Sequence, residues 1–458
     1  MRTTEFSSFR DPSGVVFYQD SVLYRQVNQC YKKQFDTMIS SGLYDKLVSK
    51  NLLVSHEVES RKECPPDVAY FLRPQQLSFI SYPYEWSFGQ LKDAALTTLR
   101  INRYAADHSM ILKDASAYNI QFVRGSALLI DTLSFDFYEE GSPWVAYGQF
   151  CRHFMAPLLL MVYTDIRLSQ LLRLYIDGIP LDLASKLLNG KGGLTGKQHI
   201  HWHARLSSKH AEDGKKADKL KTYQIKKSSY IAMIDNMIHE IEKLELKGVK
   251  TEWGEYYEHT NYSDEASKSK ALIVSDFVEQ ANPNVVWDFG ANDGRYSKIA
   301  GESGAEVVAF DIDPIAVERN YQEVKKSRVN MLPLIMDLTN PSPSIGFANR
   351  ERPSVFARHN ADCIMALAVI HHLAISNNLP LEKISAWLSG ICKFLIIEFV
   401  PKEDSQVQTL LATREDIFPN YTKEGFEKAF KENFALVSSQ DVSESARTMY
   451  LFRSNQSV

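Results

Sequence analysis

Two glycines in the second half of the chain could let a ligand approach the backbone closely. The segment VVWDFGANDGRYSKIA (residues 285–300) reads as an apolar strand, a turn containing Gly290 and Gly294, and the start of a helix. A side chain at either glycine would keep a ligand away from the backbone of the turn. Taken alone, such a turn could serve any nucleotide-binding fold, or only permit close packing of the helix.

Two carboxylates that follow this turn make the chemistry more specific. Asp311 ends the apolar segment EVVAFD, 23 residues after Asp288, where an acid can accept both hydroxyls of a ribose. Asp337 ends a third apolar segment, where an acceptor can meet the exocyclic amine of an adenine. No phosphate-binding lysine follows the glycine turn, so a nucleoside without phosphates fits better than ATP. S-adenosylmethionine is such a ligand.

The elements that would position these residues alternate along the chain. Apolar strands at NVVWDFG, EVVAFDI, DCIMALA and KFLIIEF are separated by helix-like stretches, which is typical of a doubly wound parallel sheet. FALVSSQ (434–440) and ARTMYLFR (446–453) would form a closing antiparallel hairpin. We therefore expect an α/β domain with a Rossmann-like, seven-stranded sheet.

The motif DFGANDG (288–294), with Asp311 and Asp337, resembles the cofactor site of class I S-adenosylmethionine-dependent methyltransferases. The resemblance covers about residues 263–453, and it departs from the family at Asn292, which stands near the place of a third glycine. The cofactor-binding residues that the resemblance implies are Asp288, Gly290, Asn292, Asp293, Gly294, Asp311, Ile312, Asp337, Leu338 and Ala366.

Two histidines follow the fourth strand, at the edge where ligands bind in open α/β sheets. His371 or His372 could act as a general base. Alternatively, one histidine caps the following helix or packs against it, and the other is solvated. Methyl transfer often needs no base, so neither histidine has to be catalytic. Glu398, at the end of the fifth strand, is a weaker candidate for substrate recognition.

A second constellation lies in the first half, in LKDASAYNIQF and the strand ALLID. Asp114 and Asn119 are five residues apart, and Asp131 follows twelve residues later. Phosphotransferases need an acid near the acceptor hydroxyl, then an amide and a second acid to hold magnesium. The segment resembles the catalytic loops of aminoglycoside phosphotransferases and protein kinases, which implies Asp114 as a catalytic residue and Asn119 and Asp131 as ligands of Mg-ATP.

The sequence departs from the pattern of these kinases in several places, which leaves kinase activity open. Lys113 stands where a small residue or arginine is usual, no glycine-rich loop is present, and Arg25 is the nearest basic residue on a strand. A pseudokinase is the alternative. Around this site we expect a hairpin over residues 14–27, a helix over 35–50, a strand that runs into a turn over 77–86, and a hairpin that turns at Arg124 and Gly125.

A basic tract between residues 186 and 227 is the best linker candidate, and an amphipathic helix over 229–248, ended by Gly248, would follow it. The tract contains HIHWH (199–203). We expect a polar strand or linker there rather than a metal site, since neighbouring lysines would repel a cation and no acid is close in sequence.

The composition sets the remaining limits. Basic and acidic residues nearly cancel, at 52 against 56, so nucleic acid is not expected as a partner. Scattered cysteines and no long apolar segment predict a cytoplasmic protein with reduced thiols and no membrane span. No oligomeric state is indicated.

We expect three regions: a kinase-like domain (1–185), a basic linker with a connecting helix (186–262) and a methyltransferase domain (263–458). The pairing resembles nodulation-protein-type methyltransferases, and the expected substrate is a small-molecule or saccharide acceptor. The alternatives are a bifunctional kinase and methyltransferase, or a non-catalytic scaffold with a pseudokinase domain.

Overall fold

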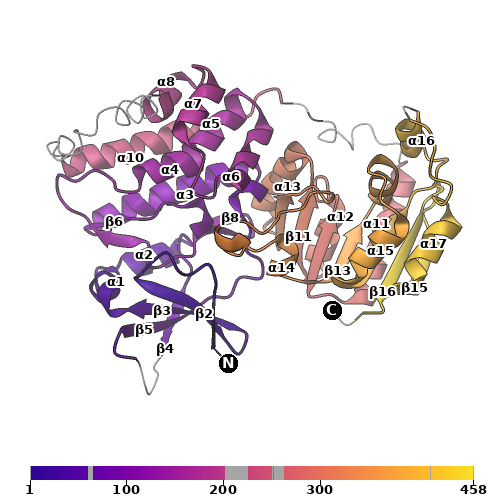
Figure 1. Ribbon diagram of the computed structural model, residues 1–458, viewed down its shortest axis with the longest axis horizontal. Coiled ribbons are helices and arrows are strands. Elements are labelled where there is room, and N and C mark those ends of the chain that lie inside the picture. Colours follow the sequence, from indigo (N-terminus) through magenta and orange to yellow (C-terminus); the bar gives the residue numbers. More distant parts are fainter. Residues whose placement is uncertain are drawn as a thin grey trace. The chain divides into compact units, whose positions relative to one another are not determined.

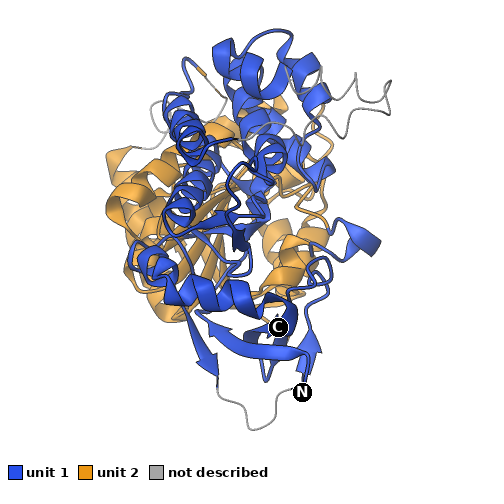
Figure 2. Ribbon diagram, turned by 90° about the vertical axis from the view of Figure 1, so that its left-hand side faces the viewer, with its two compact units in different colours: residues 1–122, 126–248, 344–353 blue, residues 123–125, 249–343, 354–458 orange. Residues whose placement is uncertain are grey.

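The computed structural model describes residues 2–59, 65–201, 225–249, 251, 263–412 and 414–456. The chain forms two compact units (Figure 2). Unit 1 comprises residues 1–122, 126–248 and 344–353, and unit 2 comprises residues 123–125, 249–343 and 354–458. Within the described residues, no helix has the length and apolar character needed to cross a membrane.

Unit 2 is built on a seven-stranded sheet with the order β12-β11-β10-β13-β14-β16-β15. The first five strands are parallel, whereas β16 pairs antiparallel with both β14 and β15. This sheet confirms the predicted Rossmann-like fold and its closing hairpin. The strands are β10 (Val285–Phe289), β11 (Glu306–Asp311), β12 (Met331–Ile335), β13 (Ala361–Ala366), β14 (Cys392–Phe399), β15 (Phe434–Asp441) and β16 (Thr448–Ser454).

Helices cover both faces of this sheet (Figure 1). They are α11 (Asp264–Ala281), α12 (Arg295–Glu302), α13 (Pro314–Ser327), α14 (Val355–Arg358), α15 (Leu381–Ser389), α16 (Ser405–Leu411) and α17 (Lys423–Lys431), with a short helical turn η10 (His372–Ser376) after β13. Local sequence fixes where the longer ones begin. The Ser263 hydroxyl accepts the amide of Ala266 at the start of α11, and Asp313 accepts two amides at the start of α13.

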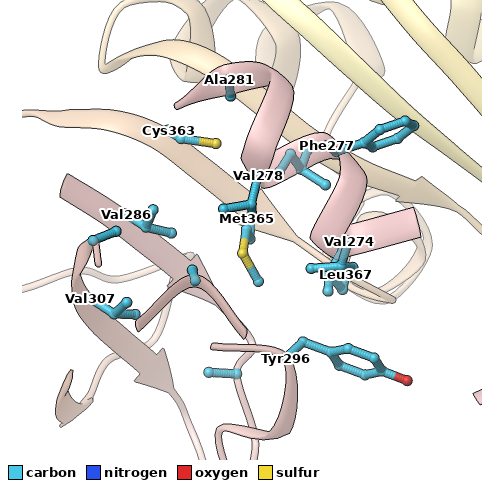
Figure 3. Close-up of a cluster of buried hydrophobic side chains, with 14 of the residues drawn as sticks. Val274, Phe277, Val278, Ala281, Val286, Tyr296, Val307, Cys363, Met365 and Leu367 are labelled. Atoms are coloured by element: carbon cyan, nitrogen blue, oxygen red, sulfur yellow. The ribbon is translucent and has the colours of Figure 1, made fainter. Parts of the chain in front are cut away.

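Alternating side chains of the strands divide the core between the two faces. Val286 of β10 faces α11 and α12 and packs in a cluster with Val274 and Met365 (Figure 3). Phe289, on the opposite face of the same strand, stacks on Trp387 of α15 with ring centroids 5.8 Å apart. Both faces of the strand are buried, which explains why its sequence reads as a continuous apolar run.

Unit 1 begins with an antiparallel sheet of five strands in the order β1-β2-β3-β5-β4 and continues as a mainly helical part, consistent with the expected kinase-like fold. The five strands are β1 (Arg2–Thr4), β2 (Gly14–Gln19), β3 (Val22–Asn28), β4 (His56–Glu59) and β5 (Val68–Pro74). Two small sheets pair β6 (Met110–Leu112) with β9 (Phe135–Phe137) and β7 (Ile120–Val123) with β8 (Ser126–Leu129). The longer helices are α1 (Lys32–Ser40), α2 (Leu43–Ser49), α3 (Phe88–Asp107), α5 (Ala156–Tyr163), α7 (Leu181–Leu188) and α10 (Lys227–Glu242).

The structure corrects two of the expected elements. The hairpin over residues 14–27 is confirmed, but the helix over 35–50 is two helices separated at Gly42, whose φ is +79°. The strand over 77–86 was a wrong prediction. There the Gln121 side chain accepts the amide of Ser81 at 2.8 Å and donates to its carbonyl at 3.0 Å, so a side chain replaces the hydrogen bonds of a neighbouring strand.

HIHWH is not a strand either, as far as the chain is described. Residues Lys197–His201 form a helical turn, and Trp202 and His203 lie outside the described residues. His199 is buried, and both of its ring nitrogens have partners that offset the cost of burial. These partners are the Tyr147 hydroxyl at 2.7 Å and Glu240 of α10 at 2.9 Å. The acid beside His199 is therefore Glu240, which is 41 residues away in the sequence.

The helix expected over 229–248 is α10, and it ends at Glu242 rather than at Gly248. Lys92 donates to the carbonyls of Glu242 and Leu244, at 2.9 and 2.8 Å, and so satisfies the end of the helix. The helix packs on α3 within unit 1, where the hydroxyl of Tyr230 donates to buried Asn102. The proposed domain limits at residues 185 and 263 stay predictions.

Candidate active site

A cavity of about 360 Å³ opens in unit 2 at the carboxyl ends of the parallel strands β10 to β13. This is the edge at which ligands bind in open α/β sheets. The residues that line it are Lys270, Asp288, Gly290, Ala291, Asn292, Tyr296, Asp311, Ile312, Met336, Asp337, Leu338, Thr339, Leu367, Ala368, Val369, His372, Leu373, Ser376, Asn377 and Leu410.

The two glycines of the turn after β10 serve different purposes. Gly290 lines the cavity with φ +72°, and a Cβ there would meet a methyl of Val369 at 2.4 Å. Gly294 does not line the cavity. It has φ +81° at the start of α12, and a Cβ there would meet the Asn320 side chain of α13 at 2.5 Å. Close packing of helices, the alternative reading of the motif, therefore accounts for the second glycine.

Asp311 lies at the end of β11, and backbone amides hold both of its carboxylate oxygens. One oxygen accepts the amide of Asn292 at 2.7 Å, and the other accepts the amide of Asp313 at 2.9 Å. A carboxylate has about four lone-pair sites, so acceptor capacity remains for two hydroxyls of a ligand. Burial raises the pKa of Asp311 to about 6.

Asp288 lines the cavity and is only 2% exposed. Its carboxylate accepts a hydrogen bond from the Ser297 hydroxyl of α12 at 2.6 Å. Burial is the main cause that raises the pKa of Asp288 to about 7. A carboxyl group near its titration point at neutral pH is suited to bind a cationic group, because the approaching charge favours ionisation.

Asp337 follows β12 and lines the cavity. Its carboxylate accepts both the amide and the hydroxyl of Thr339, at 2.8 and 2.7 Å, which orients the side chain. The apolar side chains of Ile312 and Leu338 line the cavity near it.

Seven of the ten residues implied for the cofactor thus line one cavity, whereas Asp293, Gly294 and Ala366 are not among the lining residues. Their contact with a cofactor stays a prediction.

The two histidines after β13 differ in their environment. His372 lines the cavity, and burial, together with the charge of Arg447, lowers its pKa to about 4, so the ring is neutral at pH 7. His371 is only 2% exposed, and its Nδ1 has no hydrogen-bond partner among the described residues. His372 is therefore the better candidate for contact with an acceptor.

Lys270 is a lining residue that the sequence reasoning missed. It lies on α11, and its Nζ is 2.7 Å from the carboxylate of Glu398 and 4.6 Å from the ring centroid of Tyr296. The Lys270 and Glu398 side chains are 3% and 0% exposed, so Glu398 pairs inside the protein instead of reaching substrate directly. A lysine on the apolar stripe of α11, between Ala266 and Val274, was the available signal.

Of the kinase-like residues of unit 1, Asn119 and Asp131 meet at one hydroxyl group, and other protein groups contact all three residues. Asp131 is 2.9 Å from Arg25 of β3, and its other oxygen accepts the Ser134 hydroxyl at 2.7 Å. Asn119 donates to that same hydroxyl at 3.4 Å. Asp114 accepts a hydrogen bond from the Gln149 amide at 2.8 Å.

Solved structures similar to this chain include three methyltransferases. The N-methyltransferase NodS from Bradyrhizobium japonicum WM9, with bound S-adenosyl-L-homocysteine, matches 42% of this chain and 88% of its own, at 11% identity and a TM-score of 0.30. The magnesium protoporphyrin IX methyltransferase ChlM from Synechocystis PCC 6803 matches 41% and 84%, at 18% identity and a TM-score of 0.30.

The bifunctional kinase-methyltransferase WbdD matches 42% of this chain and 40% of its own, at 17% identity and a TM-score of 0.28. With scores this low, the fold assignment rests on the strand order and register of the sheet itself.

Comparison of amino-acid sequences says more about the family of the chain than these structural comparisons do. No family model matches the chain. The nodulation protein NoeA of Rhizobium meliloti (strain 1021) is 35% identical over 458 residues, which cover 98% of this chain and 96% of NoeA. Identity at this level over nearly the whole of both proteins confirms the predicted resemblance, and the chain belongs to the family of the nodulation protein NoeA.

Proposed function

We propose that unit 2 is an S-adenosylmethionine-dependent methyltransferase that acts on a small-molecule or saccharide acceptor. The observation that carries the proposal is the convergence of Asp288, Gly290, Asp311 and Asp337 on one cavity at the carboxyl edge of a Rossmann-like sheet. The cavity offers an acid for a cation, a glycine turn, an acid for a ribose and an acid for an adenine amine. Among the described residues that line the cavity, no lysine follows the glycine turn as it would in a phosphate-binding loop.

When bound, the cofactor would supply an electrophilic methyl group on a sulfonium. The residues of the chain would bind and orient it: Asp288 and the Gly290 turn at the amino-acid side, and Asp311 at the ribose. At the other end of the cavity, His372, Ser376 and Asn377 offer polar groups beside Leu373 and Leu410. A neutral imidazole there can accept a hydrogen bond from an acceptor hydroxyl or amine, which suits a small polar acceptor.

Calorimetric titration with S-adenosylmethionine tests the proposal directly. We expect one site per chain with a micromolar dissociation constant, and S-adenosyl-L-homocysteine should compete for it. Absence of binding to the intact protein would contradict the proposal and favour a non-catalytic scaffold.

The affinity for S-adenosylmethionine is expected to increase with pH between about 6 and 8. Below their raised pKa values, of about 7 and about 6, Asp288 and Asp311 are protonated, so binding of a cationic ligand requires their ionisation. Binding should strengthen by about tenfold per pH unit while Asp288 is protonated, and should level off above its pKa. Calorimetric titrations at several pH values measure this dependence.

The variant Asp288→Asn is the matched control, because its side chain cannot ionise. Its affinity should be lower and should rise by only about twofold between pH 6 and 7, as the ionisation of Asp311 is completed. The same pH dependence in both proteins would contradict the role of Asp288.

A second candidate function is Mg-ATP binding by unit 1. The favouring observation is that Asn119 and Asp131, predicted as metal ligands, meet at the Ser134 hydroxyl. Their engagement with Arg25 and Ser134 opposes it, since a metal would have to displace these partners.

If the site binds Mg-ATP, the variant Asp131→Ala should weaken binding by at least about tenfold, because the metal loses a charged ligand. Asp136→Ala is a suitable control, since Asp136 lies on β9 and bonds to Gln34 instead. Fluorescence titration with a nucleotide analogue gives the affinities. Unchanged affinity in the Asp131 variant would exclude this site.

A further inference from the structure

Four charged side chains form a continuous buried chain in unit 2, which we call the ion chain: Lys270, Glu398, Arg447 and Asp404. Lys270 and Glu398 are 2.7 Å apart, and Arg447 Nη1 is 3.6 Å from the second oxygen of Glu398. Arg447 also makes two hydrogen bonds to Asp404, at 2.7 and 3.1 Å. None of the four side chains is more than 8% exposed, so water screens these charges little.

One end of the ion chain lies at the cavity. Among the described residues that line it, Lys270 is the only lysine or arginine, and its ion pair with Glu398 opposes the lowering of its pKa by burial. Lys270 lies near Asp288, at the side where the proposed function places the amino-acid part of the cofactor. That part carries a carboxylate, and the ammonium group of Lys270 is the group that can neutralise it.

The other end of the ion chain holds α16. Asp404 caps this helix by accepting the amide of Gln406 at 2.9 Å, and Arg447 binds the same carboxylate. Only Val407 among the seven residues of α16 is buried, so the cap contributes much of what positions the helix. Leu410 of α16 lines the cavity together with Ser376 and Asn377, at the end assigned above to the acceptor.

We propose that the ion chain couples the carboxylate of the cofactor to the position of α16. A carboxylate bound to Lys270 shares its positive charge, which strengthens the attraction between Glu398 and Arg447 across their 3.6 Å gap. Arg447 then holds Asp404, and through it α16, more firmly beside the acceptor. Arg447 is thus a positioning residue for the acceptor end. This inference rests on the proposed function and goes beyond it.

Hydrogen exchange of the full chain tests the coupling with a matched pair of ligands. S-adenosylmethionine should slow exchange of the α16 amides (405–411) by about fivefold, because the helix opens less often. Decarboxylated S-adenosylmethionine, which keeps the sulfonium and the ammonium, should slow it by less than about twofold. Both ligands should protect residues 290–294, which reports binding itself.

The double variant Arg447→Met with Asp404→Asn breaks the ion chain while leaving Lys270, Glu398 and an asparagine cap in place. It should bind S-adenosylmethionine, as protection of residues 290–294 would report, without slower exchange in α16. Lys393→Met is the control, since it removes a pair with Asp362 (2.6 Å) elsewhere on β14 and should behave like the unaltered protein.

Two results would overturn the coupling. One is equal protection of α16 by both ligands, a comparison that needs no variant and so does not depend on the folding of one. The other is protection that persists in the double variant, as direct contact with Leu410 would produce. If S-adenosylmethionine leaves residues 290–294 unprotected in the unaltered protein, the proposed function itself fails, and the coupling fails with it.

Discussion

Replacing Asp311 by alanine is expected to weaken binding of S-adenosylmethionine by roughly two orders of magnitude. The change removes the acceptor for both ribose hydroxyls, and hydrogen bonds to a charged group contribute about 1.5–3 kcal/mol each. A total loss of about 3 kcal/mol corresponds to that change in the dissociation constant. Calorimetric titration of both proteins gives the comparison.

Glu306→Ala is the matched control for this variant. Glu306 begins the same strand, β11, at the edge opposite the cavity. Its replacement should leave the affinity within about twofold of the original, as expected for a site that does not touch the ligand. An Asp311 variant that remains folded and binds with full affinity would place the ribose elsewhere in the cavity.

Replacing Glu398 by alanine is expected to lower the free energy of unfolding of unit 2 by about 3–5 kcal/mol. The carboxylate is 0% exposed, and its loss leaves Lys270 and Arg447, which are 3% and 1% exposed, without their shared anion. For a unit of this size the melting temperature should fall by roughly 10 °C. Urea denaturation followed by tryptophan fluorescence measures the change in a background that keeps Trp287 and Trp387 of unit 2 and carries phenylalanine at the other four tryptophans.

Lys393→Met serves as the comparison here as well, because the Lys393 side chain is 57% exposed and its ion pair lies near the surface. Its loss should change the stability by less than about 1 kcal/mol. If Glu398→Ala costs no more than this control, Lys270 and Arg447 must find other partners inside the protein, and the ion chain would not depend on Glu398.

Part of the lining of the cavity could be predicted because its signals are local. Gly290 and Asp311 each follow directly after an apolar strand, and parallel strands bring such positions to one edge of the sheet. The sheet itself was predictable for the same reason, since strands and helices alternate along the sequence.

What the sequence did not reveal depends on partners that are distant along the chain. Lys270 and Glu398 are 128 residues apart, and neither has a local pattern that names the other. Gln121 likewise satisfies the backbone of Ser81 from 40 residues away, so a segment with strand-like composition has no neighbouring strand. At Ser81, hydrogen bonds from a distant side chain override the local preference for a strand. At Lys270, a distant carboxylate allows a charged side chain to be buried.

The place of β16 in the sheet also sets an order of events during synthesis. β16 (Thr448–Ser454) lies between β14 and β15, although it follows both in the chain. While a ribosome still holds these residues, β14 has an open edge and Glu398 lacks Arg447, because that residue immediately precedes β16. Unit 2 therefore cannot complete its sheet during translation until residues 447–454 have emerged, and a chain stalled earlier would expose β14 to pairing with other chains.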